Sequence, residues 1–194
     1  MKLVGLDLLG CPDGKTGFCL MTDSIDEIVE VPNEEVVSKV QNISPDIVAI
    51  GSPLSLPERG NWRQAEEELH KRNIKFVAPR GLLAMEQLVM RGMKLKEIFS
   101  AKGFLVIEVS PGAFYDLLNM PRSKNYLGIK RFLKAYDLSL LKKDYRQCEV
   151  DSVVAAFVGR LFLEAKVEFL GDEDEGQIVI PKVNRFLGQV SKSE

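Results

Sequence analysis

Three carboxylates interrupt apolar stretches where a buried strand or helix would otherwise carry an aliphatic residue. Asp7 lies in the stretch 2–10, Glu108 comes near the end of the stretch 104–109, and Asp151 stands at the start of 150–165. A charge is rarely buried without a partner, and acids brought together repel one another unless a proton or a cation neutralises them. Hard oxygen ligands select Mg²⁺ or Mn²⁺ over zinc. The three residues therefore predict a divalent-metal site.

Such a site suits the hydrolysis of a phosphodiester. Two metal ions about 3.5–4 Å apart can activate water and stabilise the leaving oxygen. Asp7, Glu108 and Asp151 are then the candidate catalytic residues and metal ligands. Each also has a simpler interpretation. Asp7 could be a solvent-facing acid on an edge strand, Glu108 could pair with a basic side chain, and Asp151 could be a helix-start acid stabilised by the helix dipole.

The elements that must position these acids alternate between strands and helices. Three strands joined by short connections predict an antiparallel start, and the later strands alternate with helices, as parallel crossovers do. Strands are expected at 2–10, 16–21, 25–31, 47–50, 74–77, 104–109 and 177–180, and helices from Asn33 and at 62–72, 82–101, 113–119, 126–135 and 150–165. Ligands of open α/β sheets gather at the carboxyl ends of the strands, where two of the acids lie.

Length and composition indicate one globular domain, with a core at 1–181 and a tail at 182–194. The net charge of −2 argues against a protein that coats nucleic acid nonspecifically, but not against an enzyme that contacts it locally. Three scattered cysteines suggest no disulfide framework and favour a reducing cytoplasm. We expect no signal peptide, because the N-terminus lacks a basic region followed by an apolar one. We expect no membrane partner, because no apolar run approaches about 20 residues.

Basic residues close to these acids in the predicted topology are candidates for binding substrate phosphates. Arg59, Arg63 and Arg80 come from loops and a helix start, and are expected to rim the same cleft as the acids. A second basic patch surrounds the predicted helix 126–135 and comprises Arg122, Lys124, Lys130, Arg131 and Lys134. A solvated surface is the alternative for both groups. Trp62, near a helix start, is interpreted as a packing anchor rather than a platform for base stacking.

Five motifs in order resemble a known but uncharacterised family. They occupy 5–7, 47–57, 106–111, 150–156 and 175–181, so the resemblance runs from Val4 to Pro181. The family is the domain-of-unknown-function family 429, whose members are predicted nucleases with a ribonuclease H-like fold. The resemblance implies a central sheet of five strands, the first three antiparallel, flanked by helices. It also implies a nuclease dependent on Mg²⁺ or Mn²⁺ that uses Asp7, Glu108 and Asp151.

The chain departs from this family at Gly51. The family usually has Asp there, in the pattern Ile-Asp-Ala-Pro-Leu, whereas a related group of proposed junction resolvases tends to have Gly, as in Ile50-Gly51-Ser52-Pro53-Leu54. Glu149 is a possible substitute ligand, although residues two apart on a helix point in different directions. Two hypotheses follow: a metal-dependent nuclease, or a catalytically inactive protein that binds nucleic acid or a protein partner through the same cleft.

Overall fold

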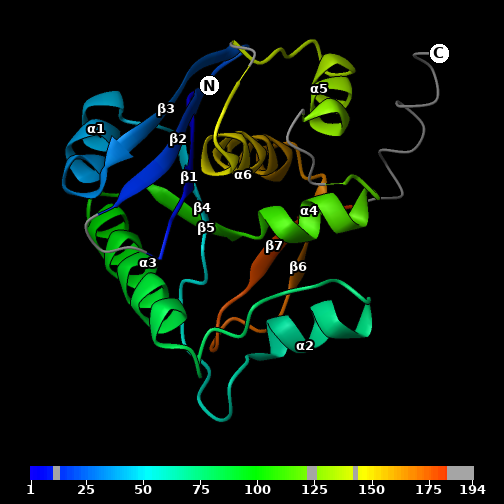
Figure 1. The fold of residues 1–194 in the computed structure, drawn as a ribbon. Helices are drawn as coiled ribbons and strands as arrows, with labels where there is room; N and C mark the ends of the chain where they lie inside the picture. The colour runs from blue at the N-terminus through cyan, green and yellow to red at the C-terminus, as the bar shows by residue number, and fades with distance from the viewer. Residues whose placement is uncertain (11–13, 122–125, 142–143, 183–194) are drawn as a thin grey trace.

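The computed structural model describes residues 1–10, 14–121, 126–141 and 144–182. Within these residues the protein is an α/β fold built on one mixed sheet of seven strands, with helices on both faces (Figure 1). The strands are β1 (Leu3–Asp7), β2 (Lys15–Met21), β3 (Ile25–Pro32), β4 (Ile47–Gly51), β5 (Leu105–Val109), β6 (Val167–Leu170) and β7 (Ile178–Pro181). The helices are the short 3₁₀ helix η1 (Asn33–Glu35), α1 (Val36–Ile43), α2 (Gln64–Lys71), α3 (Leu83–Ala101), α4 (Pro111–Leu117), α5 (Leu127–Lys134) and α6 (Gln147–Leu163).

The strand order β3-β2-β1-β4-β5-β7-β6 places β1 inside the sheet. β1, β2 and β3 pair in antiparallel fashion, whereas β1, β4, β5 and β7 run parallel. The antiparallel start and the parallel crossovers are thus confirmed. The sheet has seven strands in the described residues, rather than the five that the family resemblance implies.

One local expectation was wrong, and one strand was not expected. The stretch 74–77 is a loop rather than a strand, because the backbone N–H of Lys75 donates to a side-chain oxygen of Asp116, at 3.0 Å, instead of to a neighbouring strand. The edge strand β6 was not expected, and it pairs with β7 in antiparallel fashion. The two strands β6 and β7 extend the sheet beyond β5, and α2 packs against this extension through Ala65 and Leu69.

Side chains alternate between two packed layers on the faces of the sheet. One layer contains Leu3 of β1 and Ile107 of β5, packed under α4, α5 and α6. The other layer contains Leu6 of β1 and Ile50 of β4, packed under α1 and α3. A side chain on β1 or β5 can therefore be assigned to a face by its position along the strand.

Helix α6 lies directly on β1 and β2. A Cβ added at Gly5 would lie 2.0 Å from the carbonyl oxygen of Ser152, and one added at Gly17 would lie 2.0 Å from that of Cys148. Only glycine permits such a close approach of two backbones. The helix is almost wholly buried, as expected, but it begins at Gln147, so that Asp151 lies in its second turn rather than its first.

Several expectations fall partly outside the described residues. These include most of the tail at 182–194, and Cys11. Cys19 and Cys148 are free and buried, and burial, followed by the charges of Glu30 and Asp7, raises the pKa of Cys148 to about 12. No helix in the part of the chain that the structure describes combines the length and apolar character needed to cross a membrane.

Candidate active site

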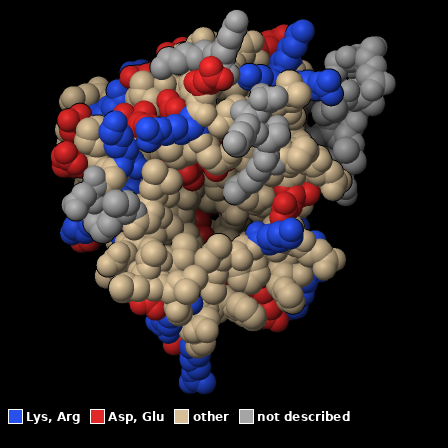
Figure 2. All heavy atoms as spheres, in the orientation of Figure 1, with Lys and Arg blue, Asp and Glu red and all other residues tan. Residues whose placement is uncertain are grey.

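Asp7, Glu108 and Asp151 line one cavity of about 350 Å³, which we call the carboxylate pocket. It opens where the parallel strands β1, β4 and β5 end, and the second turn of α6 reaches the same place. Figure 2 shows a hollow on this face of the molecule, with acidic atoms inside it and a rim that is mostly uncharged. The structure thus places the three predicted acids around one cavity.

The three acids do not share one face of the sheet. In the pairing of β1, β4 and β5, Glu108 lies beside Ile50 and Leu6, and these two side chains face α3. Asp7 and Gly51 lie beside each other one residue later along their strands. Asp7 therefore extends on the α6 side, like Gly5, whereas Glu108 extends on the opposite side. Asp7 and Asp151 approach the pocket from the same side, and Glu108 approaches it from the other.

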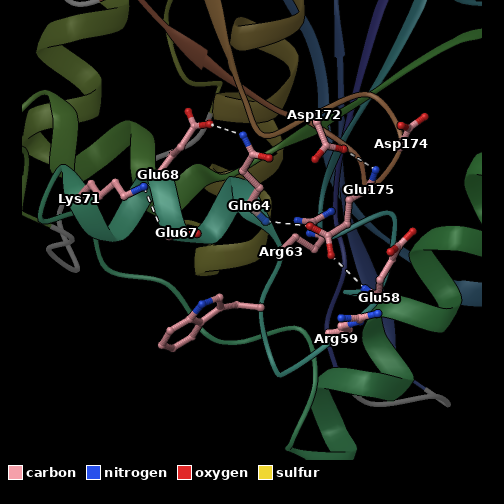
Figure 3. A pocket seen from close by; sticks show the side chains of 11 residues that line it. Glu58, Arg59, Arg63, Gln64, Glu67, Glu68, Lys71, Asp172, Asp174 and Glu175 are labelled. Carbon is pink, nitrogen blue, oxygen red and sulfur yellow. Dashed lines mark hydrogen bonds and ion pairs between the residues drawn. The ribbon is translucent and has the colours of Figure 1, made fainter.

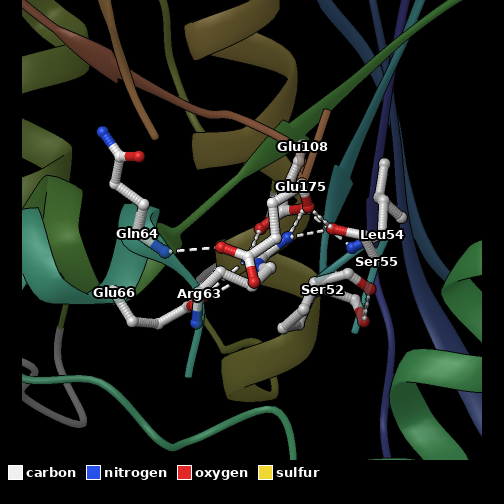
Figure 4. A network of polar contacts seen from close by, with 9 residues as sticks. Ser52, Leu54, Ser55, Arg63, Gln64, Glu66, Glu108 and Glu175 are labelled. Atoms are coloured by element: carbon white, nitrogen blue, oxygen red, sulfur yellow. Dashed lines mark hydrogen bonds and ion pairs between the residues drawn. The ribbon is translucent and has the colours of Figure 1, made fainter. Parts of the chain in front are cut away.

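Glu108 forms a buried ion pair with Arg63 (Figure 4). Arg63 Nη1 donates to Glu108 Oε2 at 2.8 Å, and Arg63 Nη2 donates to Glu108 Oε1 at 2.5 Å. The backbone N–H of Leu54 also donates to Oε2, at 2.7 Å. Arg63 further donates from Nε and Nη2 to Glu66, and from Nη1 to the hydroxyl of Ser55. Both oxygens of Glu108 are thus engaged by protein donors.

Burial and the hydrogen bonds of the ion pair act in opposite directions on both side chains. Burial outweighs the hydrogen bonds at Glu108 and raises the pKa of this carboxyl above its ordinary range, against the opposing effect of Arg63 and of the Leu54 N–H. For Arg63, burial opposes the charged form, but the hydrogen bonds to Glu108 and Glu66 outweigh it and raise the pKa further. Arg63 therefore stays cationic. The structure thus shows Glu108 paired with a basic side chain, which was its simpler interpretation.

The two aspartates differ from Glu108 in their surroundings. Asp151 is 5% exposed, and Gln147 Nε2 donates to its Oδ1 at 2.8 Å. Asp7 is partly exposed and lies on an inner strand, so the interpretation as an edge-strand acid was wrong. A Cβ added at Gly51 would lie 2.9 Å from Asp7 Oδ1. A carboxylate at position 51 would thus stand beside Asp7, on the α6 side.

Glu149 does not replace that missing carboxylate. Its Oε2 accepts a hydrogen bond from the backbone N–H of Arg146, at 2.8 Å, and so caps the start of α6. Glu149 is also absent from the residues that line the carboxylate pocket. Its position in the helix explains both facts, because residues two apart are rotated away from one another.

Of the predicted phosphate-binding residues, Arg59, Arg80 and Lys130 do not line the carboxylate pocket. Arg80 donates to the carbonyl oxygen of Gly60 and so ties two loops together. Lys130 belongs to α5, which packs through Phe132 on Phe157 of α6. Its predicted neighbours Arg122 and Lys124 lie outside the described residues.

Arg59 lines a different cavity of about 560 Å³, shown in Figure 3. Acidic residues dominate this cavity: Glu58, Glu67, Glu68, Asp172, Asp174 and Glu175. Glu175 accepts from the backbone N–H groups of Gln64, at 2.8 Å, and Glu58, at 2.9 Å, and thereby caps α2 and fastens the loop before it. These contacts give Glu175 a structural role, and the charge of the six acids opposes the binding of phosphate.

Lys75 is the basic residue that sequence reasoning missed. Among the described residues that line the carboxylate pocket, it is the only Lys or Arg. It was assigned to a strand at 74–77, and a lysine on an exposed strand edge gives no functional signal. Its neighbours Phe76 and Val77 also line the pocket, and together with Met85 and Leu88 of α3 they form an apolar wall.

The side chains present fit one hydrated divalent cation better than a three-carboxylate site. Within the described ranges, no group of three or more His, Cys, Asp or Glu side chains is arranged to hold a metal. Mg²⁺, however, usually takes one or two carboxylates and completes its shell with water and substrate phosphate. Asp7 and Asp151 meet that requirement, whereas Glu108 is committed to Arg63.

Comparison with family models, curated proteins and solved structures found no match. The family resemblance of the five motifs therefore stays an expectation.

Proposed function

We propose that the protein is a divalent-metal-dependent phosphodiester hydrolase, a nuclease of ribonuclease H-like fold, with Asp7 and Asp151 as its metal ligands. The observation that carries this proposal is the approach of both aspartates to one pocket from the α6 side of the sheet, at the carboxyl end of β1. The parallel strands β1, β4 and β5 and the antiparallel β1–β3 unit are consistent with that fold.

The metal is proposed to be Mg²⁺ or Mn²⁺, which accept oxygen ligands. A bound ion would supply Lewis-acid activation of water and of the phosphoryl group. The protein contributes orientation. Gln147 holds one oxygen of Asp151, Lys75 provides a positive charge for the phosphate, and Arg63 keeps Glu108 fixed in the wall of the pocket. In this proposal Glu108 supports the pocket instead of acting as a third ligand.

Asp7→Asn is expected to reduce metal-dependent cleavage by about a hundredfold or more, because even residues that only support a metal ligand contribute about 10–100-fold. The measurement is Mn²⁺-dependent cleavage of a panel of single strands, duplexes, RNA–DNA hybrids and branched junctions. Asp23→Asn makes the same chemical change on an exposed turn and should leave cleavage unchanged. Cleavage of every substrate at equal rates by Asp7→Asn and the parent protein would refute the proposal.

Gly51→Asp should lower the thermal stability of the metal-free protein and enlarge the stabilisation by Mn²⁺. The new carboxylate repels Asp7 when no metal is present, and adds a ligand beside it when metal binds. A tighter complex stabilises the fold by mass action, about 1.4 kcal/mol for each tenfold gain in affinity at saturating metal. The measurement is the Tm with Mn²⁺ and with EDTA.

Gly10→Asp is the matched control for that change, since Gly10 is exposed after β1 and lies outside the carboxylate pocket. It adds the same charge without adding a ligand. An equal response of the two variants to Mn²⁺ would show that position 51 does not face a metal site.

The second candidate function is a catalytically inactive module that binds nucleic acid or a protein. Two observations favour it: Gly51 supplies no carboxylate, and Arg63 occupies both oxygens of Glu108. If the parent protein shows neither a rise in Tm with Mn²⁺ nor cleavage of any substrate, whereas Gly51→Asp gains the rise in Tm, the pocket is catalytically inactive, as the second function requires.

A further inference from the structure

A second cavity adjoins the carboxylate pocket and shares two of its lining residues. That cavity, of about 450 Å³, is lined by Trp62, His70, Lys75 and Phe76, and we call it the aromatic groove. Lys75 and Phe76 line both cavities. A chain-like ligand with one unit at Asp7 and Asp151 would therefore pass Lys75 and Phe76 before it reached Trp62.

Aromatic side chains form the surface of this groove. Trp62 is 49% exposed, and its ring meets the ring of Phe76 edge to face, with 5.7 Å between the centroids. His70 stacks on Trp62 at 6.3 Å, with an angle of 19° between the planes. The interpretation of Trp62 as a packing anchor thus describes only half of its surface, and the exposed half is available for contact with a flat ligand.

The charges along this path suit a ligand with few phosphates. Among the described residues that line the carboxylate pocket or the aromatic groove, Lys75 is the only Lys or Arg. Duplex DNA carries one charge per about 1.7 Å of its axis, and proteins that grip it neutralise several phosphates with Lys and Arg. A surface with one cation and exposed aromatic rings fits unstacked bases, whose flat faces stack on such rings.

We propose that the substrate is an unpaired, single-stranded segment of nucleic acid. Its reacting phosphodiester lies at Asp7 and Asp151, an adjacent phosphate lies at Lys75, and its bases contact Phe76 and Trp62. This inference rests on the proposed function, because it takes the substrate to be a phosphodiester. It goes further because it assigns the form of nucleic acid that is bound, single-stranded rather than duplex, and the residues that select this form.

The test uses the fluorescence of Trp62, which is the only tryptophan in the chain. A twelve-nucleotide single strand, as DNA and separately as RNA, is titrated into the protein in Mn²⁺ and in EDTA, and then the matching DNA duplex is titrated. Stacking of a base on Trp62 should change its emission saturably. We expect the duplex to bind at least about tenfold more weakly than the single strand, because paired bases cannot stack on the protein.

Phe76→Ala should weaken binding of the single strand about tenfold, and Phe76→Tyr should preserve it, because both aromatic rings offer a face for stacking. Phe169→Ala is the matched control. Phe169 is a half-exposed phenylalanine on β6 that lines neither cavity, so its loss should leave affinity unchanged. Comparison of the DNA and RNA titrations shows which sugar the groove accepts.

Three outcomes would overturn the inference: a duplex that binds as tightly as the single strand, a Phe76→Ala affinity equal to that of Phe169→Ala, or no change in fluorescence with any nucleic acid. If any of these occurs while Mn²⁺-dependent cleavage is still lost in Asp7→Asn, the proposed hydrolase stands and only the single-strand assignment falls. If the single strand binds through Phe76 but no substrate is cleaved, the assignment of the ligand stands and hydrolysis falls.

Discussion

Arg63→Met is expected to lower the free energy of unfolding by about 3–5 kcal/mol, because it leaves two carboxylates buried without their cation. The Arg63 side chain is fully buried, and it binds Glu66 and Glu108 at the same time. Methionine fills similar volume, so the loss would report charge rather than a cavity. Urea denaturation followed by circular dichroism measures the effect, as a shift in midpoint at constant slope.

Arg146→Met is the matched control for that substitution. Like Arg63, Arg146 precedes a helix, and its backbone N–H donates to a glutamate three residues later. Its side chain, however, is 73% exposed and pairs with Glu30 at 3.1 Å. An exposed ion pair is worth at most about 1 kcal/mol. If the two variants lost equal stability, the buried ion pair would contribute no more to the free energy of unfolding than the exposed one.

A double variant tests the contribution of the buried ion pair by changing the acid together with its cation. Arg63→Met combined with Glu108→Gln should lose less stability than the sum of the two single changes, because the second change removes one of the charges stranded by the first. Additive losses would mean that Arg63 and Glu108 contribute independently, contrary to the hydrogen bonds between them.

Gly5→Ala is expected to destabilise the protein by about 3 kcal/mol or more, at the upper end of the cost of overpacking. The new methyl group would lie 2.0 Å from the carbonyl oxygen of Ser152 and 2.5 Å from the backbone nitrogen of Ala156, neither of which can rotate away. Helix α6 must then move off β1, and Asp151 moves with it. We therefore expect a fall in Tm together with weaker stabilisation by Mn²⁺.

Gly159→Ala provides the matched control within the same helix. A Cβ at Gly159 would lie 3.4 Å from Ile47 Cγ2 and 3.5 Å from Ala49 Cβ, which are ordinary contacts. Alanine is also the better helix former, by about 1 kcal/mol. This variant should be as stable as the parent or more so. A loss equal to that of Gly5→Ala would show that α6 tolerates no added methyl group, whatever the distance.

The central part of the fold could be predicted from local patterns. The stretches around Asp7, Ile50 and Glu108 are apolar runs of strand length, and α6 is an apolar run of helix length, so both their types and their order were recognisable. The convergence of Asp7, Glu108 and Asp151 on one pocket also followed, because parallel strands end at the same edge of a sheet.

The partner of Glu108 could not be predicted in the same way. Glu108 lies in an apolar run, 104–109, whose residues give no alternation, so the face on which its side chain emerges depends on the pairing of β5 with β4. Arg63 lies 45 residues earlier, and its place near a loop and a helix start predicted a residue at the rim of the cleft, where it would bind phosphate, rather than a buried partner of Glu108. The loop at 74–77 was mistaken for a strand because Ile74, Phe76 and Val77 are apolar for another reason, which is their contact with the pocket and with α2.

The covering of β1 and β2 by α6 has a consequence for synthesis of the protein. The hairpin strands are complete once residue 32 has been made, but the helix that buries one of their faces ends only at residue 163. At a synthesis rate of about 5–20 residues per second, that face stays uncovered for on the order of ten seconds. During this interval Leu3, Cys19 and Met21 present an apolar surface on the nascent chain. We therefore expect the ribosome-bound intermediate to depend on chaperones more than its finished stability would suggest.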